Sequence, residues 1–153
     1  ISPYAATKKC GEILESFSID YSINIFSAHR TPELLKNHLK ETEEEGTKIY
    51  IAIAGLAAHL AGAIAAKTTK PVIGVPADNG PLKGIDALLS TVQMPKGIPV
   101  STVAIGSNGA TNAGYLAAQI LSLGSEEIAK KLKSSREKNM QSVLEVNQKL
   151  SKK

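Results

Sequence analysis

Two histidines each lie in a turn that follows a strand-like segment, and together they form the candidate functional site of the chain. The first, His29, lies in SAHRTP (residues 27–32), and the second, His59, lies in GLAAHL (residues 55–60). Ligands of open α/β sheets bind at such turns, at the carboxyl ends of the strands. Parallel strands end at the same edge of a sheet, so the two turns can converge although 30 residues separate the histidines.

The neighbours of the two histidines suit a ligand site better than a metal centre. Arg30 lies beside His29, and Gly55 opens a turn of small residues that lets the backbone approach a ligand closely. His38 falls within a polar helical stretch, where we expect a solvated side chain. Since no cysteine or carboxylate completes a ligand set around the histidines, we predict no metal.

The elements that must position these turns alternate between helix and strand. We predict strands at 21–27, 48–54, 71–75 and 99–105, and helices at 3–17, 32–45, 58–68, 85–93, 110–123 and from about 125 onward. The strands are short and rich in Val and Ile, as expected where helices cover both faces of a sheet. The pattern predicts an α/β fold, a three-layer doubly wound parallel sheet of flavodoxin or Rossmann type.

The start of the chain differs from this pattern. A fold of this kind normally opens with a strand, yet Ser2 and Pro3 signal a helix start at once, and Ile1 stands in place of Met. We therefore expect a first strand, and the turn after it, to be missing from this sequence. A phosphate-binding turn could be missing with them.

Composition limits the class of protein. The chain has 153 residues, 42% of them hydrophobic, which predicts one domain (1–153) with an α/β core at 1–124 and a C-terminal helix at 125–153. Residues 130–153 hold eight of the 18 Lys and Arg residues, and the chain has no Trp for base stacking, so we predict no nucleic-acid partner. The sequence shows no apolar run long enough to span a membrane and no leader segment, and its single cysteine cannot form an intramolecular disulfide. We therefore expect a soluble, intracellular protein.

Five motifs in register resemble the class I N5-carboxyaminoimidazole ribonucleotide mutase family of purine biosynthesis, over Ile1 to about Leu123. They are SAHRTP, AGLAAHLAG (54–62), KTTKPVIGVP (67–76), GIDALLSTVQMPKGIPVSTVAIG (84–106) and ATNAGYLAAQIL (110–121). The resemblance implies an isomerase that moves a carboxyl group from the exocyclic nitrogen of an aminoimidazole ribonucleotide to ring carbon C4. It also implies transient release and recapture of CO2, with no metal, ATP or organic cofactor.

The same resemblance implies roles for individual residues. His29 would donate a proton to the departing nitrogen and later remove the C4 proton, which suits an imidazole because its free pKa lies near working pH. Arg30 would hold the substrate phosphate through two parallel hydrogen bonds. The remaining substrate-binding residues would line the base and carboxylate; they are Ser27, Ala28, Ala54, Gly55, Ala57, Ala58, His59 and Leu60.

Three departures from the family pattern are visible. The family begins with a strand that ends in a Gly-Ser-x-Ser-Asp loop, which holds the ribonucleotide, and this chain has no such motif. The family commonly has Gly where this chain has Leu56, and Pro where it has Ala61. Neither of the last two changes removes a reacting group.

Two alternatives remain open at the level of sequence. Class II carboxylases, which use free CO2, typically have Lys after the strand histidine and a polar Arg-Ser-Asn turn, so Arg30 and the Ala-Ala-His turn at 57–59 favour class I. The other alternative is an inactive, nucleotide-binding relative.

The resemblance also implies a cytoplasmic homo-octamer. Two segments rich in small and apolar residues, 84–99 and 110–121, are expected to be covered by neighbouring subunits. The amphipathic C-terminal helix is expected to lie along another subunit.

Overall fold

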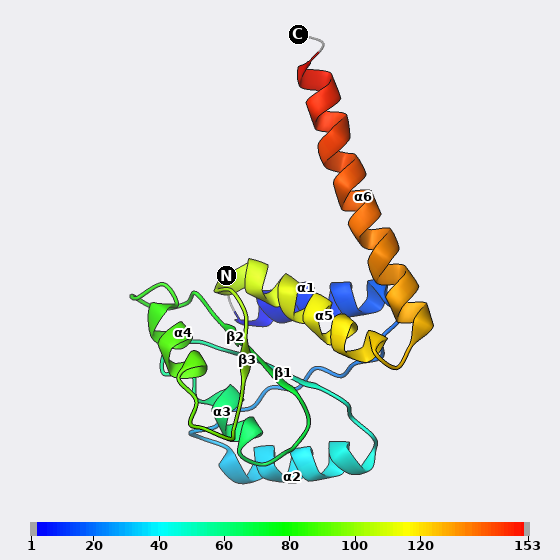
Figure 1. Ribbon diagram of the computed structural model, residues 1–153. Helices are drawn as coiled ribbons and strands as arrows, with labels where there is room; N and C mark the ends of the chain where they lie inside the picture. Colours follow the sequence, from blue (N-terminus) through cyan, green and yellow to red (C-terminus); the bar gives the residue numbers. More distant parts are fainter. Residues whose placement is uncertain (1–2, 152–153) are drawn as a thin grey trace.

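The computed structural model describes residues 3–151 and has a parallel sheet between two layers of helices (Figure 1). The strands are β1 (Tyr50–Ala54), β2 (Val72–Pro76) and β3 (Ser101–Thr102), in the order β1-β2-β3. The predicted parallel α/β architecture is confirmed, although β3 is shorter than the predicted strand at 99–105.

All six predicted helices are present, with some shifted ends. They are α1 (Pro3–Ser16), α2 (Pro32–Glu44), α3 (Leu60–Ala65), α4 (Ile85–Val92), α5 (Gly106–Ser122) and α6 (Glu126–Leu150). The helix predicted at 58–68 is shorter at both ends, and α5 begins earlier than the predicted position 110. Ser2, the predicted start signal of α1, lies outside the described residues.

The side chains of β1 alternate between the two helical layers. Ile51 and Ile53 pack into the cluster that includes residues of α1 and α5, whereas Ala52 belongs to the cluster that includes residues of α2 and α3. Because both faces of β1 are covered, its sequence is almost continuously apolar.

The prediction of a strand at 21–27 is wrong. Within the described residues this segment pairs with no strand, and it runs between α1 and α2 (Figure 1). Its side chains still contact both layers, because the Tyr21 hydroxyl donates to Glu15 of α1 at 2.6 Å while Phe26 packs against His38 of α2. Alternation predicts a β-prone segment, but a strand also needs a neighbour to share its hydrogen bonds.

Helix α5 packs closely against α1 through small side chains. Ala110, Ala113 and Ala117 are buried, and a Cβ at Gly114 would stand 2.7 Å from Ile13 of α1. The expectation that a neighbouring subunit covers segment 110–121 is therefore wrong for its small residues, because the core of the chain itself buries them.

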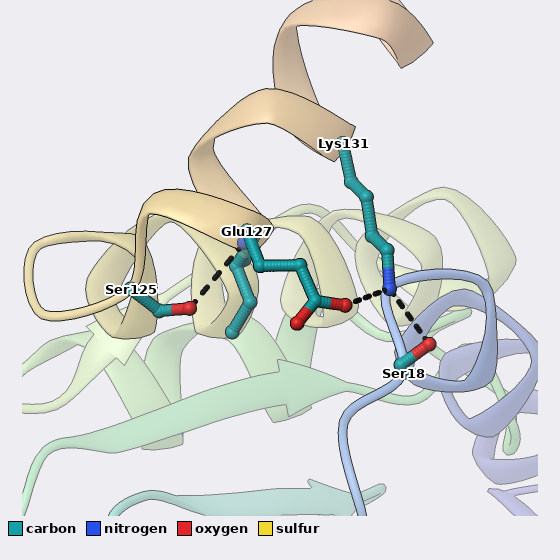
Figure 2. Close-up of polar contacts among 5 residues, drawn as sticks. Ser18, Ser125, Glu127 and Lys131 are labelled. Carbon is teal, nitrogen blue, oxygen red and sulfur yellow. Dashed lines mark hydrogen bonds and ion pairs between the residues drawn. The ribbon is translucent and has the colours of Figure 1, made fainter.

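Polar contacts order the start of α6, and one of them, from Lys131 to Ser18, joins the helix to the loop after α1 (Figure 2). The Ser125 hydroxyl caps the helix by accepting from the Ile128 N–H at 3.4 Å. Lys131 pairs with Glu127 at 2.7 Å and donates to the Ser18 hydroxyl at 2.8 Å. The cap contributes about 1 kcal/mol, and an exposed ion pair contributes less.

Beyond its first turns α6 leaves the domain (Figure 1). The hydroxyls of Ser135 and Tyr115 lie 3.1 Å apart, and residues 136–150 are all exposed. Within residues 3–151, no helix has both the length and the apolar character that crossing a membrane requires.

Burial of Cys10 between α1 and the sheet generates a prediction about pH. The side chain is 4% exposed, and burial raises the pKa of the thiol to about 11, whereas a free thiol has a pKa of about 8.5. The folded state disfavours the thiolate, so Cys10 stabilises the fold fully below about pH 8.5 and progressively less as the pH rises toward 11.

Across this pH range, we expect the free energy of unfolding of the parent protein to fall by on the order of 2 kcal/mol more than that of the Cys10→Ala variant. Denaturant titrations of both proteins at several pH values measure this difference. Equal slopes for the two proteins, or thiol labelling at the rate of a free cysteine, would contradict the prediction.

Candidate active site

The turn that carries His29 is closed on itself by hydrogen bonds. The Thr31 N–H donates to the Ser27 carbonyl at 2.8 Å, and the Thr31 hydroxyl accepts from the Ser27 N–H at 3.0 Å. The Ser27 hydroxyl accepts from the Arg30 N–H at 3.2 Å. Thr31 occupies the N-cap position of α2, as predicted, but its side chain closes the turn and makes no capping bond.

The turn after β1 bends sharply into α3. The Ala58 N–H donates to the Leu56 carbonyl at 2.8 Å, and the His59 N–H donates to the Ala57 carbonyl at 2.7 Å. Leu56 has a φ of 58°, in the left-handed region that glycine adopts without a steric penalty. This conformation gives a physical reason for the glycine that the family resembled in the sequence analysis commonly has at this position.

The two turns bring the imidazoles of His29 and His59 together at the carboxyl edge of the sheet. The ring centroids lie 5.2 Å apart with an interplanar angle of 26°, so the rings are stacked. Both side chains are exposed to solvent. An exposed imidazole pair beside a cavity can contact a planar ligand and exchange protons with it.

A cavity of about 1110 Å³ joins these turns to the region between segment 21–27 and β1. Nine of the ten sequence-predicted site residues line it: Ser27, Ala28, His29, Ala54, Gly55, Ala57, Ala58, His59 and Leu60. Arg30, the tenth, is exposed and is not among the lining residues. Arg30 therefore stands outside the cavity, beside His29.

His38 differs from its predicted state. Its ring lies 4.8 Å from that of Phe26, and the side chain is half-buried, so the prediction of a solvated helix residue is wrong. The sequence could not show this contact, because it joins α2 to the preceding segment. Among residues 3–151, no three His, Cys, Asp or Glu side chains gather where they could hold a metal ion.

Asn79, in the turn after β2, is a residue of this region that the sequence analysis missed. Its Oδ1 is buried without a hydrogen-bond partner in the described structure, and the side chain packs against Gly55 so closely that it would clash with a Cβ there. The signal was the position of Asn79 after the predicted strand at 71–75, because the turn after a parallel strand opens on the same sheet edge.

Comparison with known proteins gives a consistent result. The family model described as AIR carboxylase matches residues 2–142. N5-carboxyaminoimidazole ribonucleotide mutase of Bacillus subtilis is 49% identical, over 97% of this chain and 92% of the relative. The mutase of Thermotoga maritima is 52% identical, over 94% of this chain and 82% of the relative.

A solved structure has the same fold as this chain. The crystal structure of Treponema denticola PurE aligns with a TM-score of 0.88 and 36% sequence identity, covering 96% of this chain and 90% of that one. The likeness in sequence thus extends over nearly the whole fold, including both histidine turns. The chain belongs to the AIR carboxylase family.

Proposed function

We propose that this chain is an N5-carboxyaminoimidazole ribonucleotide mutase of purine (IMP) biosynthesis, which forms 4-carboxy-5-aminoimidazole ribonucleotide. The observation that carries the proposal is the stacked pair of His29 and His59 at the mouth of a cavity, in a chain about half identical to proteins with that name. The ligand of this site would be the small ribonucleotide itself.

His29 supplies the proton chemistry in this proposal. As imidazolium it donates a proton to the exocyclic nitrogen while the bond from that nitrogen to the carboxyl carbon breaks, which leaves an amine and CO2. Ring carbon C4 then forms a bond to the CO2 carbon, and the neutral imidazole takes the proton from C4. The proton lent in the first step returns in the second, so the cycle balances without another acid or base.

The remaining residues bind and enclose the substrate. Arg30, exposed beside His29, would hold the phosphate at the rim, where a guanidinium can make two parallel hydrogen bonds. His59 stacks on His29 and would fix the plane of its ring. The small residues after β1 would let the backbone close around the base and keep CO2 from escaping.

Replacing His29 by Asn tests its role. We expect kcat to fall by about 10² to 10⁴, since Asn keeps hydrogen-bonding capacity but cannot exchange a proton near neutral pH. Turnover is measured on the protein expressed from its complete coding sequence. His38→Asn is the matched control, because His38 packs on Phe26 outside the histidine pair, and it should keep near-normal turnover. Activity of His29→Asn within a few-fold of the parent would remove His29 from the mechanism.

The contact between Gly55 and Asn79 generates a second test. Gly55→Ala places a methyl group against the Asn79 side chain, so the turn must shift, and we expect a loss of about 1–3 kcal/mol in stability together with reduced turnover. Asn79→Ala removes the clashing group. In a double-mutant cycle, the variant that carries both Gly55→Ala and Asn79→Ala should therefore recover most of the stability that Gly55→Ala alone loses. Additive effects of the two substitutions would show that the contact does not hold the turn.

We further propose that the chain assembles as a homo-octamer in the cytoplasm. Exposed apolar side chains support an assembly, and they form two stripes: Ile85, Leu89 and Val92 on α4, and Met140, Val143, Leu144 and Leu150 on α6. Both stripes repeat at helical spacing, as in a helix that packs against a partner. The α6 stripe begins where the helix has already left its own domain.

Light scattering at micromolar concentration tests the assembly. We expect a mass eight times the 16.1 kDa of one chain, and a smaller mass for Val143→Asp, since that change puts a charge within the α6 stripe. Lys138→Asp changes charge on the same exposed helix without removing an apolar group and is the control. A monomer mass for the parent protein would contradict the octamer.

A further inference from the structure

The turn after β2 contains one of the two Asn-Gly pairs of the sequence. The pairs are Asn79–Gly80, between β2 and α4, and Asn108–Gly109, within α5. In such a pair the glycine nitrogen can attack the carboxamide of the asparagine before it, because glycine has no Cβ to hinder the approach. The rate of this attack depends on how the fold holds the two groups, and the fold holds these two pairs differently.

Neither reacting group of the first pair is held by a hydrogen bond within residues 3–151. The Oδ1 atom of Asn79 is buried without a partner, and its Nδ2 atom is not among the buried atoms. The Gly80 N–H donates to no described group, although the Gly80 carbonyl accepts from the Lys83 N–H at 3.2 Å. Rotation of the Asn79 side chain toward the Gly80 nitrogen therefore breaks no hydrogen bond.

The second pair is held by its helix. Gly109 is the fourth residue of α5, so its N–H makes the first hydrogen bond of the helix, to the carbonyl of the N-cap residue Ile105. Gly109 is also buried, and a Cβ there would overlap the Ala104 carbonyl. Although Asn108 itself is exposed, attack by the Gly109 nitrogen requires the first turn of α5 to open.

Packing between the turns after β1 and β2 explains why a reactive pair stands at 79 and 80. Gly80 has a φ of 95°, a conformation that suits glycine, and a Cβ there would stand 2.5 Å from the Leu56 side chain. Asn79 fills the space over Gly55. The contacts that support the turn after β1 thus place a glycine directly after an asparagine.

We propose that Asn79–Gly80 is a site of spontaneous deamidation that alters the turn after β1. The Gly80 nitrogen forms a bond to the Asn79 Cγ while the bond from Cγ to Nδ2 breaks, and the proton of the Gly80 N–H leaves with Nδ2 as ammonia. Water then opens the cyclic imide at either carbonyl, which gives aspartate or isoaspartate. The reaction consumes water, releases ammonia and involves no oxidation or reduction.

Both products disturb contacts that support the histidine turn. Aspartate puts a charge where the unpartnered Oδ1 of Asn79 is buried, and a buried charge without a partner is costly. Isoaspartate adds a methylene to the backbone before Gly80, which moves Gly80 relative to the Leu56 side chain. Because these contacts support the turn between Gly55 and His59, the reaction limits how long the histidine pair keeps its geometry.

Peptide mass spectrometry tests the proposal on the 153-residue chain after incubation at mildly alkaline pH. Trypsin separates the two pairs, because cleavage after lysine, except before proline, gives fragments 68–83 and 97–130. Fragment 68–83 should gain one mass unit and resolve into aspartate and isoaspartate forms, at least about tenfold faster than fragment 97–130 gains mass. Equal rates in the folded protein, or an unchanged fragment 68–83, would overturn the proposal.

The same experiment in denaturant isolates the contribution of the fold. Both pairs are Asn-Gly, so their rates should converge when the helix no longer holds Gly109. Rates that stay as far apart as in the folded protein would assign the difference to neighbouring residues and would overturn the role given to the fold.

Two matched variants test the chemistry. Asn79→Gln keeps a carboxamide but would have to close a larger ring, which forms far more slowly, so fragment 68–83 should no longer gain mass. Asn108→Gln is the control and should leave the conversion of Asn79 unchanged. A mass gain in fragment 68–83 of Asn79→Gln that matches the parent would place the reaction elsewhere and overturn the proposal.

NMR of the imidazoles tests the consequence for the histidine turn. The incubated protein and Asn79→Asp should both shift the His59 imidazole signals, whereas Asn108→Asp puts a charge at the exposed start of α5 and should leave them unchanged. Unshifted His59 signals in fully converted protein would overturn the effect on the turn. None of these measurements depends on turnover or on the reaction proposed for His29.

Discussion

The site depends on one constraint, which is that parallel strands joined through helices all end at one edge of the sheet. Strand β1 carries this constraint because it is packed between α1 and α5 on one face and α2 and α3 on the other. Packing of its partly buried Ile side chains and of the buried Ala52 fixes where Gly55 begins its turn. From there the chain reaches His59, and the ring meets His29 from a separate turn. The alignment of the two imidazoles is thus a consequence of how β1 packs between the helices, several residues before His59.

The turns themselves show how local conformation serves this edge. Leu56 adopts a left-handed conformation that costs a non-glycine residue of order 1 kcal/mol, and its side chain lies against Gly80 of the next turn. Asn79 packs against Gly55 in the same place. The turns after β1 and β2 therefore support one another. Such support lets the turn after β1 hold an unfavourable backbone conformation.

Much of this arrangement could be predicted from the sequence, because its determinants are local. Cap residues, Pro32, Gly46 and the periodicity of apolar residues indicate six helices and the two longer strands. The turn that carries His59 follows from the rule that ligands bind at carboxyl ends of parallel strands, whereas the turn that carries His29 was predicted after a segment, 21–27, that pairs with no described strand. Contacts between distant segments could not be predicted in this way. The packing of His38 on Phe26, the contact of Asn79 with Gly55 and the missing partner of segment 21–27 all depend on such contacts.

Transfer of a carboxyl group within the substrate is tested by an isotopic label in that group. N5-carboxyaminoimidazole ribonucleotide with a ¹³C-carboxyl group is converted in buffer that contains unlabelled bicarbonate, and the product carboxyl is read by NMR. If CO2 is released and recaptured inside the site, the product keeps most of the label and exchanges only a minor part. A product that carries only unlabelled carbon, formed equally fast from aminoimidazole ribonucleotide and free CO2, would identify a carboxylase and contradict transfer within the substrate.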